Sequence, residues 1–355
     1  MIKPLTSLRF IFAFMVFSSH LGFLEISKSD FSRSLYANLF REGYIGVSFF
    51  FILSGFVLAY KYQDIILKKQ KSKKTFFIAR VARIFPLHIL TFIIAIPLTY
   101  NIFVHRKLHW FAQAVTNFTL TQSYIPKSSI YFSFNGPSWS ISDEMFFYLL
   151  FPFLLFLIFK FRKRYFLFLA IISIVPLLTL VIPSSYYHHI FYISPFVRIF
   201  DFSIGVYLYN MYKIFSSKKS AINYDFMEIS SILLLSLFFF FHQQIPQVAR
   251  YSFYYWLPMS YLIFSFSFQG GMVSKLLSKK IFFHLGEISF GFYMFHQLVL
   301  RYFDWFNSKF HVFENDLLMI IITFSISLMI SHYSFVKFEN PMKNFVKNKL
   351  SDFSI

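Results

Sequence analysis

Long apolar stretches recur along the whole chain and are separated by short polar segments. We expect ten of them to form helices, over approximately 5–24, 44–60, 81–100, 137–159, 165–182, 190–212, 227–242, 253–268, 281–303 and 317–337. A helix of roughly 20 apolar residues is long enough to cross the hydrocarbon core of a bilayer. The pattern therefore predicts an all-α polytopic membrane protein with about ten transmembrane helices.

Basic residues are distributed unevenly between the predicted loops. When alternate loops are assigned to the same side, one side holds 24 of the 34 Lys and Arg residues. The positive-inside rule makes that side cytoplasmic, and an even number of spans places both termini there. The longest predicted loops, 25–43 and 101–136, are then external, and neither is long enough for an independent domain. We expect a multi-pass protein of a bacterial inner membrane, with one membrane domain over 1–355, an uncleaved first helix and no appended soluble domain.

The composition narrows the chemistry. Hydrophobic residues make up 57% of the chain, mean hydropathy is +0.58 and there is no cysteine, which excludes disulfides, thiolate nucleophiles and cysteine-ligated metals. A net charge of +19 could suggest nucleic acid, but the basic residues cluster in short loops, so we expect the lipid bilayer and not nucleic acid as partner. His105 and His109 have a metal-compatible spacing without an acidic companion, and we predict no metal site.

Arg9 and His20 lie eleven residues apart within the first apolar stretch. Eleven residues are almost three helical turns, so the two side chains are expected on one helix face, about 16 Å apart along the axis. Charged or titratable groups at membrane depth are costly, which makes both residues candidates for a functional site. The alternative is a snorkelling arginine and a packed, hydrogen-bonded histidine.

Further polar clusters occur in four other stretches. Gly46, Ser54 and Gly55 favour close packing of helices. Arg80 and Arg83 share a helix face and suit phosphate oxygens, although two interfacial topology charges would look the same. Another cluster comprises Trp139, Ser140, Asp143 and Glu144, and a last one leads through Tyr293 to His296.

The adjacent carboxylates Asp143 and Glu144 cannot point in the same direction, so one can face a cavity while the other meets the interface. Glu144 is the candidate for orienting a histidine or binding a sugar hydroxyl. The alternative is an acid pair favoured by the dipole at a helix start. For His296, a satisfied core histidine is an equally good interpretation of its own segment.

Six motifs of this chain follow one another in the order found in integral-membrane acyltransferase family 3, which includes bacterial O-antigen and Nod-factor O-acetyltransferases. The chain resembles this family over nearly its whole length. The matching elements are Arg9-x10-His20, the Gly-Val-x-x-Phe-Phe-x-x-Ser-Gly-Phe stretch at 46–56, Arg80-x-x-Arg83-x-x-Pro86, the Trp-Ser-x-Ser-x-Glu segment at 139–144, Pro195-x-x-Arg198, and Ser289 through Tyr293 to His296. Departures include Ser48, where relatives often have an acid, Asp143, where they are usually apolar, and Gln297, in a region where a proline is common.

The resemblance implies transfer of an acyl group, most simply acetyl from cytoplasmic acetyl-CoA, to a hydroxyl of a surface or lipid-linked glycan. It assigns catalysis to His20, as general base or transient acyl carrier, with Arg9 and Glu144 assisting. Arg80 and Arg83 would bind the donor, and Trp139, Ser140, Asp143, Arg198, Tyr293 and His296 would contact the substrate or support the site. Two other classes stay open: a transporter or flippase of a lipid-linked sugar or anion, and a scaffold for envelope enzymes.

Overall fold

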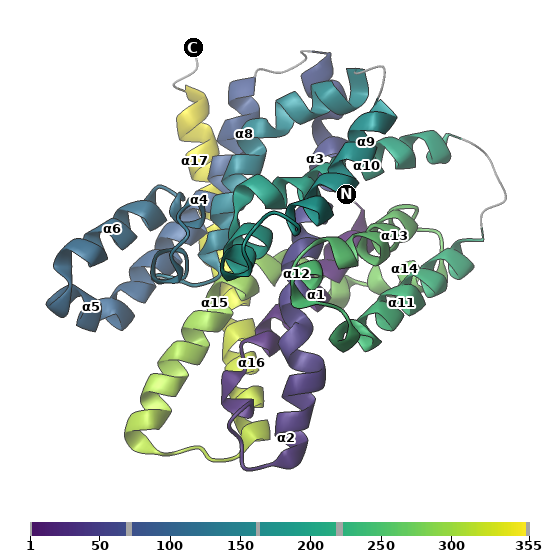
Figure 1. The fold of residues 1–355 in the computed structure, drawn as a ribbon. Helices are drawn as coiled ribbons and strands as arrows, with labels where there is room; N and C mark the ends of the chain where they lie inside the picture. The colour runs from purple at the N-terminus through teal and green to yellow at the C-terminus, as the bar shows by residue number, and fades with distance from the viewer. Residues whose placement is uncertain (1, 69–72, 161–163, 218–222, 353–355) are drawn as a thin grey trace. The chain divides into compact units, whose positions relative to one another are not determined.

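The computed structural model describes residues 2–68, 73–160, 164–217 and 223–352, and regular secondary structure within these ranges is entirely helical (Figure 1). Each of the ten predicted stretches coincides with a helix. They are α1 (Lys3–Ser19), α3 (Gly46–Leu67), α4 (Lys73–Ala95), α8 (Ser138–Lys160), α9 (Arg164–Leu178), α10 (Pro195–Ser216), α11 (Tyr224–Phe240), α13 (Trp256–Ser267), α15 (Lys280–Phe310) and α16 (Asp316–Ser334). The predicted all-α fold is confirmed.

The connections are also largely helical. They contain α2 (Asp30–Leu35), α5 (Tyr100–His105), α6 (Lys107–Phe118), α7 (Ser128–Tyr131), α12 (Gln247–Arg250), α14 (Met272–Leu277) and α17 (Asn340–Asp352). Short 3₁₀ or π turns are η1 (Gly22–Leu24), η2 (Tyr36–Phe40), η3 (Arg41–Ile45), η4 (Ile96–Thr99), η5 (Gln122–Tyr124), η6 (Ser184–Tyr186), η7 (His188–Ile193), η8 (His242–Gln244), η9 (Phe253–Tyr255) and η10 (Phe335–Glu339). The segments 25–43 and 101–136 were expected to be loops, but they are mostly helix. Their external position stays a prediction.

Four helical segments of the described chain are long and apolar enough to cross a membrane: Asp30–Leu67, Lys74–His105, Ser138–Phe159 and Asp316–Lys349. A fifth candidate is the pair Ser184–Ile193 and Pro195–Ser216, which is bent by 44°. The first helix has 17 residues and spans about 25 Å at the α-helical rise. The crossing number of ten and the cytoplasmic position of both termini stay predictions.

The chain divides into two compact units, each formed by segments distant in sequence. The first comprises Met1–Arg9, Val47–Lys74 and Asp143–Gly286, and the second comprises Phe10–Gly46, Thr75–Ser142 and Glu287–Ile355. Both α1 and α8 therefore contribute one end to each unit, as does α15.

In the first unit, glycines bring the backbones of α3 and α10 into direct contact. A Cβ at Gly55 would lie 2.0 Å from the carbonyl oxygen of Phe202, and one at Gly205 would lie 1.9 Å from that of Ile52. Small residues at a helix crossing allow this approach, as the packing interpretation of Gly55 predicted.

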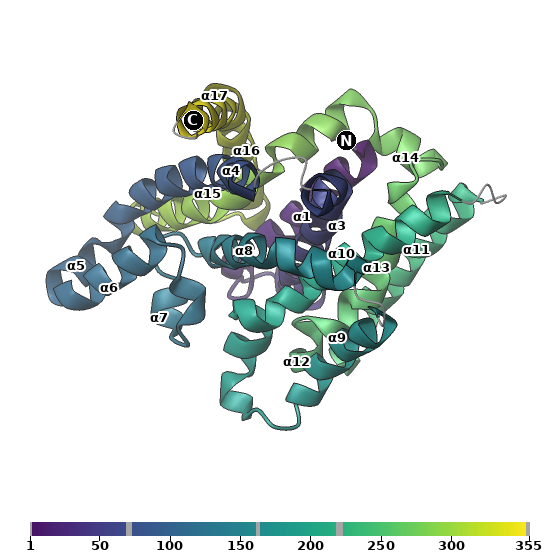
Figure 2. The same cartoon turned by 90° about the horizontal axis from the view of Figure 1, so that it is seen from above.

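The antiparallel helices α11 and α13 pack side by side in the same unit (Figure 2).

Gly55→Ala is expected to destabilise the protein, since its methyl group would overlap a carbonyl oxygen on α10. Overpacking of this kind typically costs about 1–3 kcal/mol, and a backbone contact leaves little room for relaxation. Thermal unfolding of purified protein in detergent would measure the loss. Gly22→Ala is the matched control, because a Cβ at Gly22 has nothing within 4 Å, and equal melting of both variants would contradict the prediction.

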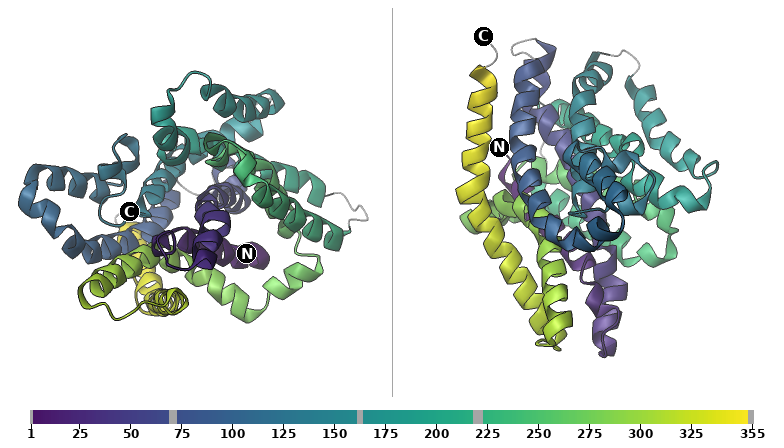
Figure 3. Two further views of the ribbon diagram at one scale, coloured as in Figure 1. Left: turned by 60° about the horizontal axis from the view of Figure 1, so that its bottom comes forward. Right: turned by 90° about the vertical axis from the view of Figure 1, so that its left-hand side faces the viewer.

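In the second unit, a core cluster of Ala95, Phe134 and Leu298 joins α4, the segment before α8, and α15, with Phe92 and Trp110 packed against it. Helix α16 continues through η10 into α17 (Figure 3). The hydroxyls of Thr323, Ser327 and Ser331 are buried and bond the carbonyl four residues earlier, so α16 presents a stripe of satisfied small side chains.

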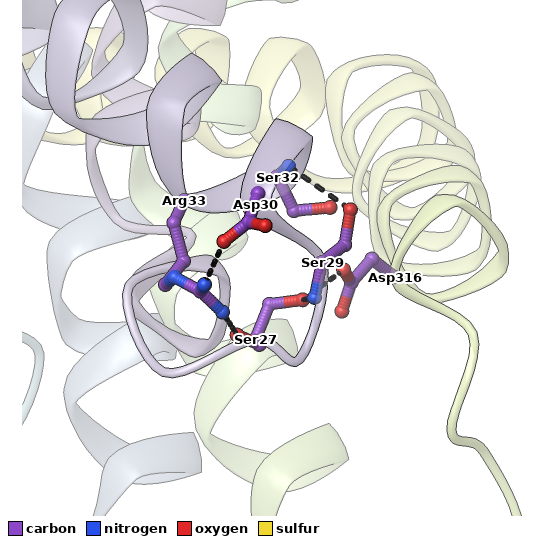
Figure 4. A network of polar contacts seen from close by, with 6 residues as sticks. All are labelled: Ser27, Ser29, Asp30, Ser32, Arg33 and Asp316. Carbon is purple, nitrogen blue, oxygen red and sulfur yellow. Dashed lines mark hydrogen bonds and ion pairs between the residues drawn. The ribbon is translucent and has the colours of Figure 1, made fainter.

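The turn that follows α1 is tied to the start of α16. Ser27 donates from Oγ to the Asp316 carboxylate at 2.5 Å and accepts from the Ser29 backbone N–H at 3.0 Å (Figure 4). Arg33 pairs with Asp30 and also donates to the Ser27 carbonyl. This network holds the loop that lies directly after His20.

Candidate functional site

His20 and His296 form the centre of the candidate site in the second unit. His20 follows the last residue of α1, and His296 lies within α15. His20 Nδ1 and His296 Nε2 are 2.9 Å apart, with ring centroids 5.0 Å apart. Two predicted site residues separated by 276 positions are thus in hydrogen-bond contact.

One geometric detail of the sequence prediction is wrong. His20 does not share the α1 helix with Arg9, because α1 ends at Ser19 and the His20 backbone N–H bonds the Phe17 carbonyl at 3.0 Å in a turn. The chain then enters the 3₁₀ turn η1 at Gly22. This early ending leaves the His20 side chain exposed, whereas His296 is fully buried.

The hydrogen bonds of His296 determine which His20 nitrogen carries a lone pair. His296 Nδ1 lies 3.2 Å from the carbonyl oxygen of Phe292, which can only accept, so Nδ1 is the protonated nitrogen. In a neutral His296 ring, Nε2 must then accept from His20 Nδ1–H. Neutral His20 is left with its lone pair on Nε2, where it can act as a base or nucleophile.

Aromatic side chains fix the orientation of the His296 ring. Phe292 stacks on it with an interplanar angle of 20°, and Phe17 meets it edge-on at 6.2 Å. Both phenylalanines are fully buried. The acceptor nitrogen of His296 is consequently held in one place against His20.

Ser140 and Tyr293 join the same cluster. Their hydroxyl oxygens are 2.8 Å apart, and the Tyr293 ring centroid lies 5.9 Å from that of His296. Tyr293 and Ser140 are buried, as is the neighbouring Trp139. Helix α15 therefore connects the start of α8 to the histidine pair, and four of the predicted site residues form one continuous group.

The segment before α8 contributes contacts that the sequence interpretation missed. Asn135 donates from Nδ2 to the Met294 carbonyl at 2.9 Å. A Cβ at Gly136 would lie 2.1 Å from the Gln297 amide oxygen, so this glycine makes room for Gln297 beside His296. The glycine directly before the Pro-Ser-Trp segment was the available signal for such a close approach.

Arg9 and Glu144 belong to the first unit, while His20 belongs to the second. Arg9 is half-buried on α1. The Glu144 carboxylate, also half-buried, accepts from the Tyr148 hydroxyl at 2.8 Å, one turn further along α8. The adjacent Asp143 is fully buried, so the two carboxylates differ in environment as their adjacency predicted.

Arg80 and Arg83 lie on α4 in the second unit. Arg80 is half-buried and Arg83 is exposed. Pro86 follows within the helix, and His88 is buried with Nε2 donating to the Asn117 carbonyl at 2.9 Å. A pair of guanidinium groups at i and i+3 on one helix offers several hydrogen-bond donors to phosphate oxygens.

Arg198 is fully buried in the first unit and forms an ion pair with Asp201, Nη1 to Oδ2, at 2.8 Å. It also donates to the Tyr251 carbonyl at 2.7 Å and to Ser48 Oγ at 2.9 Å. Asp201 in turn accepts from Ser252 Oγ at 3.0 Å and from the Trp256 indole. The network joins α3, α10 and the segment before α13.

The side chains of Ser48 and Asp201 both contact Arg198. Ser48 offers a neutral oxygen, and Asp201 supplies the negative charge one turn away on α10. The i,i+3 spacing of Arg198 and Asp201 was visible in the sequence, but Asp201 was not singled out.

Comparison with known proteins identifies the family. The family model described as an acyltransferase domain, of acyltransferase family 3, matches residues 3–333. "Acyltransferase MdmB" of Streptomyces mycarofaciens is 29% identical over 324 residues, covering 85% of this chain and 79% of that protein. "Putative acetyltransferase ORF330" of Acidianus two-tailed virus is 28% identical over 270 residues, covering 74% of each. No solved structure matches the chain. The chain belongs to acyltransferase family 3 and is a membrane acyltransferase.

Proposed function

We propose that this acyltransferase moves an acyl group, acetyl from acetyl-CoA, to a hydroxyl of a surface or lipid-linked glycan, as a multi-pass protein of a bacterial inner membrane. The observation that carries the proposal is the contact between His20 and His296 at 2.9 Å. It leaves the Nε2 lone pair of His20, an exposed residue, backed by a buried and oriented partner. This arrangement suits activation of a hydroxyl, which is a weak nucleophile at neutral pH.

In the proposed reaction, His20 Nε2 removes the proton of the acceptor hydroxyl while its oxygen attacks the thioester carbonyl. The carbon–sulfur bond breaks, an ester forms, and the proton passes from His20 to the leaving thiolate. Positive charge on the His20 ring is shared through Nδ1–H with His296. Arg80 and Arg83 bind the donor phosphates, and the family resemblance assigns supporting roles to Arg9 and Glu144.

His20 Nε2 could also take up the acyl group before the acceptor does, because the same lone pair serves as a nucleophile. Incubating purified protein with radiolabelled acetyl-CoA and no acceptor separates the two routes. Label retained on the protein through His20 indicates an acyl carrier, and label released only when acceptor is added indicates a general base.

The proposal is tested by adding labelled acetyl-CoA to membranes that contain the protein, and by mass spectrometry of the cell-surface glycan. We expect label in the glycan or lipid-linked fraction, lost in membranes carrying His20→Ala at equal abundance. Unchanged acetylation in a strain lacking the gene, with failed glycan export, would instead identify a transporter. Label on a small hydrophobic alcohol and not on glycan would retain the transferase and replace the acceptor.

A further inference from the structure

Helices α5 and α6 form a hairpin in the second unit (Figure 1). The buried face of α6 is polar and its outward face is apolar. Its buried positions are polar: Gln113 is 2% exposed and Asn117 is fully buried. Its outward positions are apolar, and we call them the α6 stripe: Leu108 (86% exposed), Phe111 (53%), Val115 (61%) and Phe118 (53%). In a surface helix surrounded by water, the apolar face would be buried and the polar face would be exposed.

The buried polar face is held by specific bonds, so α6 cannot rotate to hide the stripe. The Asn117 carbonyl accepts from His88 on α4, its Nδ2 donates to Ser133 Oγ at 2.6 Å, and its Oδ1 accepts from Ser138 Oγ at 3.2 Å. Gln113 donates to the carbonyl of Ser129. Rotation would leave these groups buried without partners.

The stripe continues an apolar surface of a candidate membrane span. Helix α5 ends the span Lys74–His105, whose outward side chains include Ile93 (54% exposed) and Tyr100 (70%). The turn between α5 and α6 carries the exposed Arg106 and Lys107, which are suited to a layer of lipid phosphates.

Helix α6 then runs back alongside α4. It has 12 residues and is about 18 Å long, which is shorter than a hydrocarbon core of roughly 30 Å. Its last residue, Phe118, packs against Phe85 of α4 at a centroid distance of 6.1 Å. The chain thus reverses direction at the charged turn between α5 and α6, and α6 returns along α4.

We propose that α5 and α6 form a re-entrant hairpin, with lipid acyl chains covering the α6 stripe and lipid phosphates contacting Arg106 and Lys107. Non-helical backbone is excluded from lipid, but a helix with satisfied backbone bonds and a buried polar face is not. An amphipathic helix with basic residues at its end is typical of membrane insertion. This inference concerns membrane contact and does not depend on the proposed reaction.

The absence of cysteine makes the test direct, because one introduced thiol can be labelled with an environment-sensitive fluorophore without background. Val115→Cys places the probe on the stripe, and Lys107→Cys is the matched control on the charged turn of the same helix. Each labelled protein is placed, one copy per disc, in lipid nanodiscs with or without spin-labelled acyl chains. Iodide serves as the aqueous quencher.

We expect the probe at 115 to emit at shorter wavelength than the probe at 107, and to be quenched by spin-labelled chains more strongly than by iodide. The probe at 107 should show the opposite preference. Phe111→Cys on the same face repeats the measurement if Val115→Cys does not fold. A probe at 115 quenched by iodide alone, or shielded from both quenchers, would overturn the proposal, since water or protein would then cover the stripe.

Discussion

His20→Gln is expected to lower the rate of acyl transfer by about 10²–10⁴-fold, the range typical for loss of a general acid–base group. The glutamine amide can still donate a hydrogen bond to His296 Nε2, in place of the 2.9 Å contact that His20 Nδ1 makes. It has no basic nitrogen to take the hydroxyl proton. Because His20 is exposed, protein abundance in the membrane should not change. Labelled-acetyl transfer normalised to abundance is the measurement.

Two substitutions at His296 separate positioning from packing. His296→Gln can accept from His20 Nδ1–H through its amide oxygen, whereas His296→Leu cannot, so we expect the leucine variant to lose more activity. His332→Gln, at an exposed position of α16, is the matched control and should retain full activity. Equal activity of the glutamine and leucine variants would mean that His296 does not orient His20.

Asp201→Asn and Arg198→Met should each destabilise the protein strongly. Removing one partner of a fully buried ion pair typically costs about 3–5 kcal/mol, because the remaining charge is left uncompensated. The loss is larger than that expected for an exposed pair such as Lys213 and Asp64, 3.6 Å apart. Unfolding of purified protein, followed by size-exclusion chromatography after heating, would measure it.

The double variant Arg198→Met with Asp201→Asn is the informative companion. It removes both charges and fills much of the same volume, so it should be more stable than either single variant. Lys213→Met is the control for loss of a cation at an exposed site. A double variant as unstable as the sum of the single ones would show that the charges do not compensate each other.

The sequence predicted the helical class and the family because both depend on patterns within short segments of the chain. Apolar stretches mark each helix, and the motif residues lie within a few turns of one another. It could not predict that His20 would meet His296, since 276 residues separate them and no periodicity links α1 to α15. The contact follows from packing of Phe17 and Phe292 around the His296 ring.

Two errors have a common physical origin. The sequence predicts a loop where α6 lies, because the buried face of that helix carries Gln113 and Asn117, polar residues whose partners come from other segments. The sequence does not mark Asp201 as important, because its role depends on Arg198, Ser252 and Trp256 meeting around it. In both cases the polar residue is stabilised by contacts that do not exist until the chain is folded.

The arrangement around Arg198 also bears on how this family can diverge. One guanidinium reaches Ser48 on α3 and Asp201 on α10, so its counter-charge can be carried by either helix. A relative with an acid at the position of Ser48 is expected to tolerate a neutral residue at the position of Asp201. A chain with a neutral residue at the position of Ser48, such as this one, is expected to need the acid at the position of Asp201. The two positions should therefore covary across the family, although 153 residues separate them in sequence.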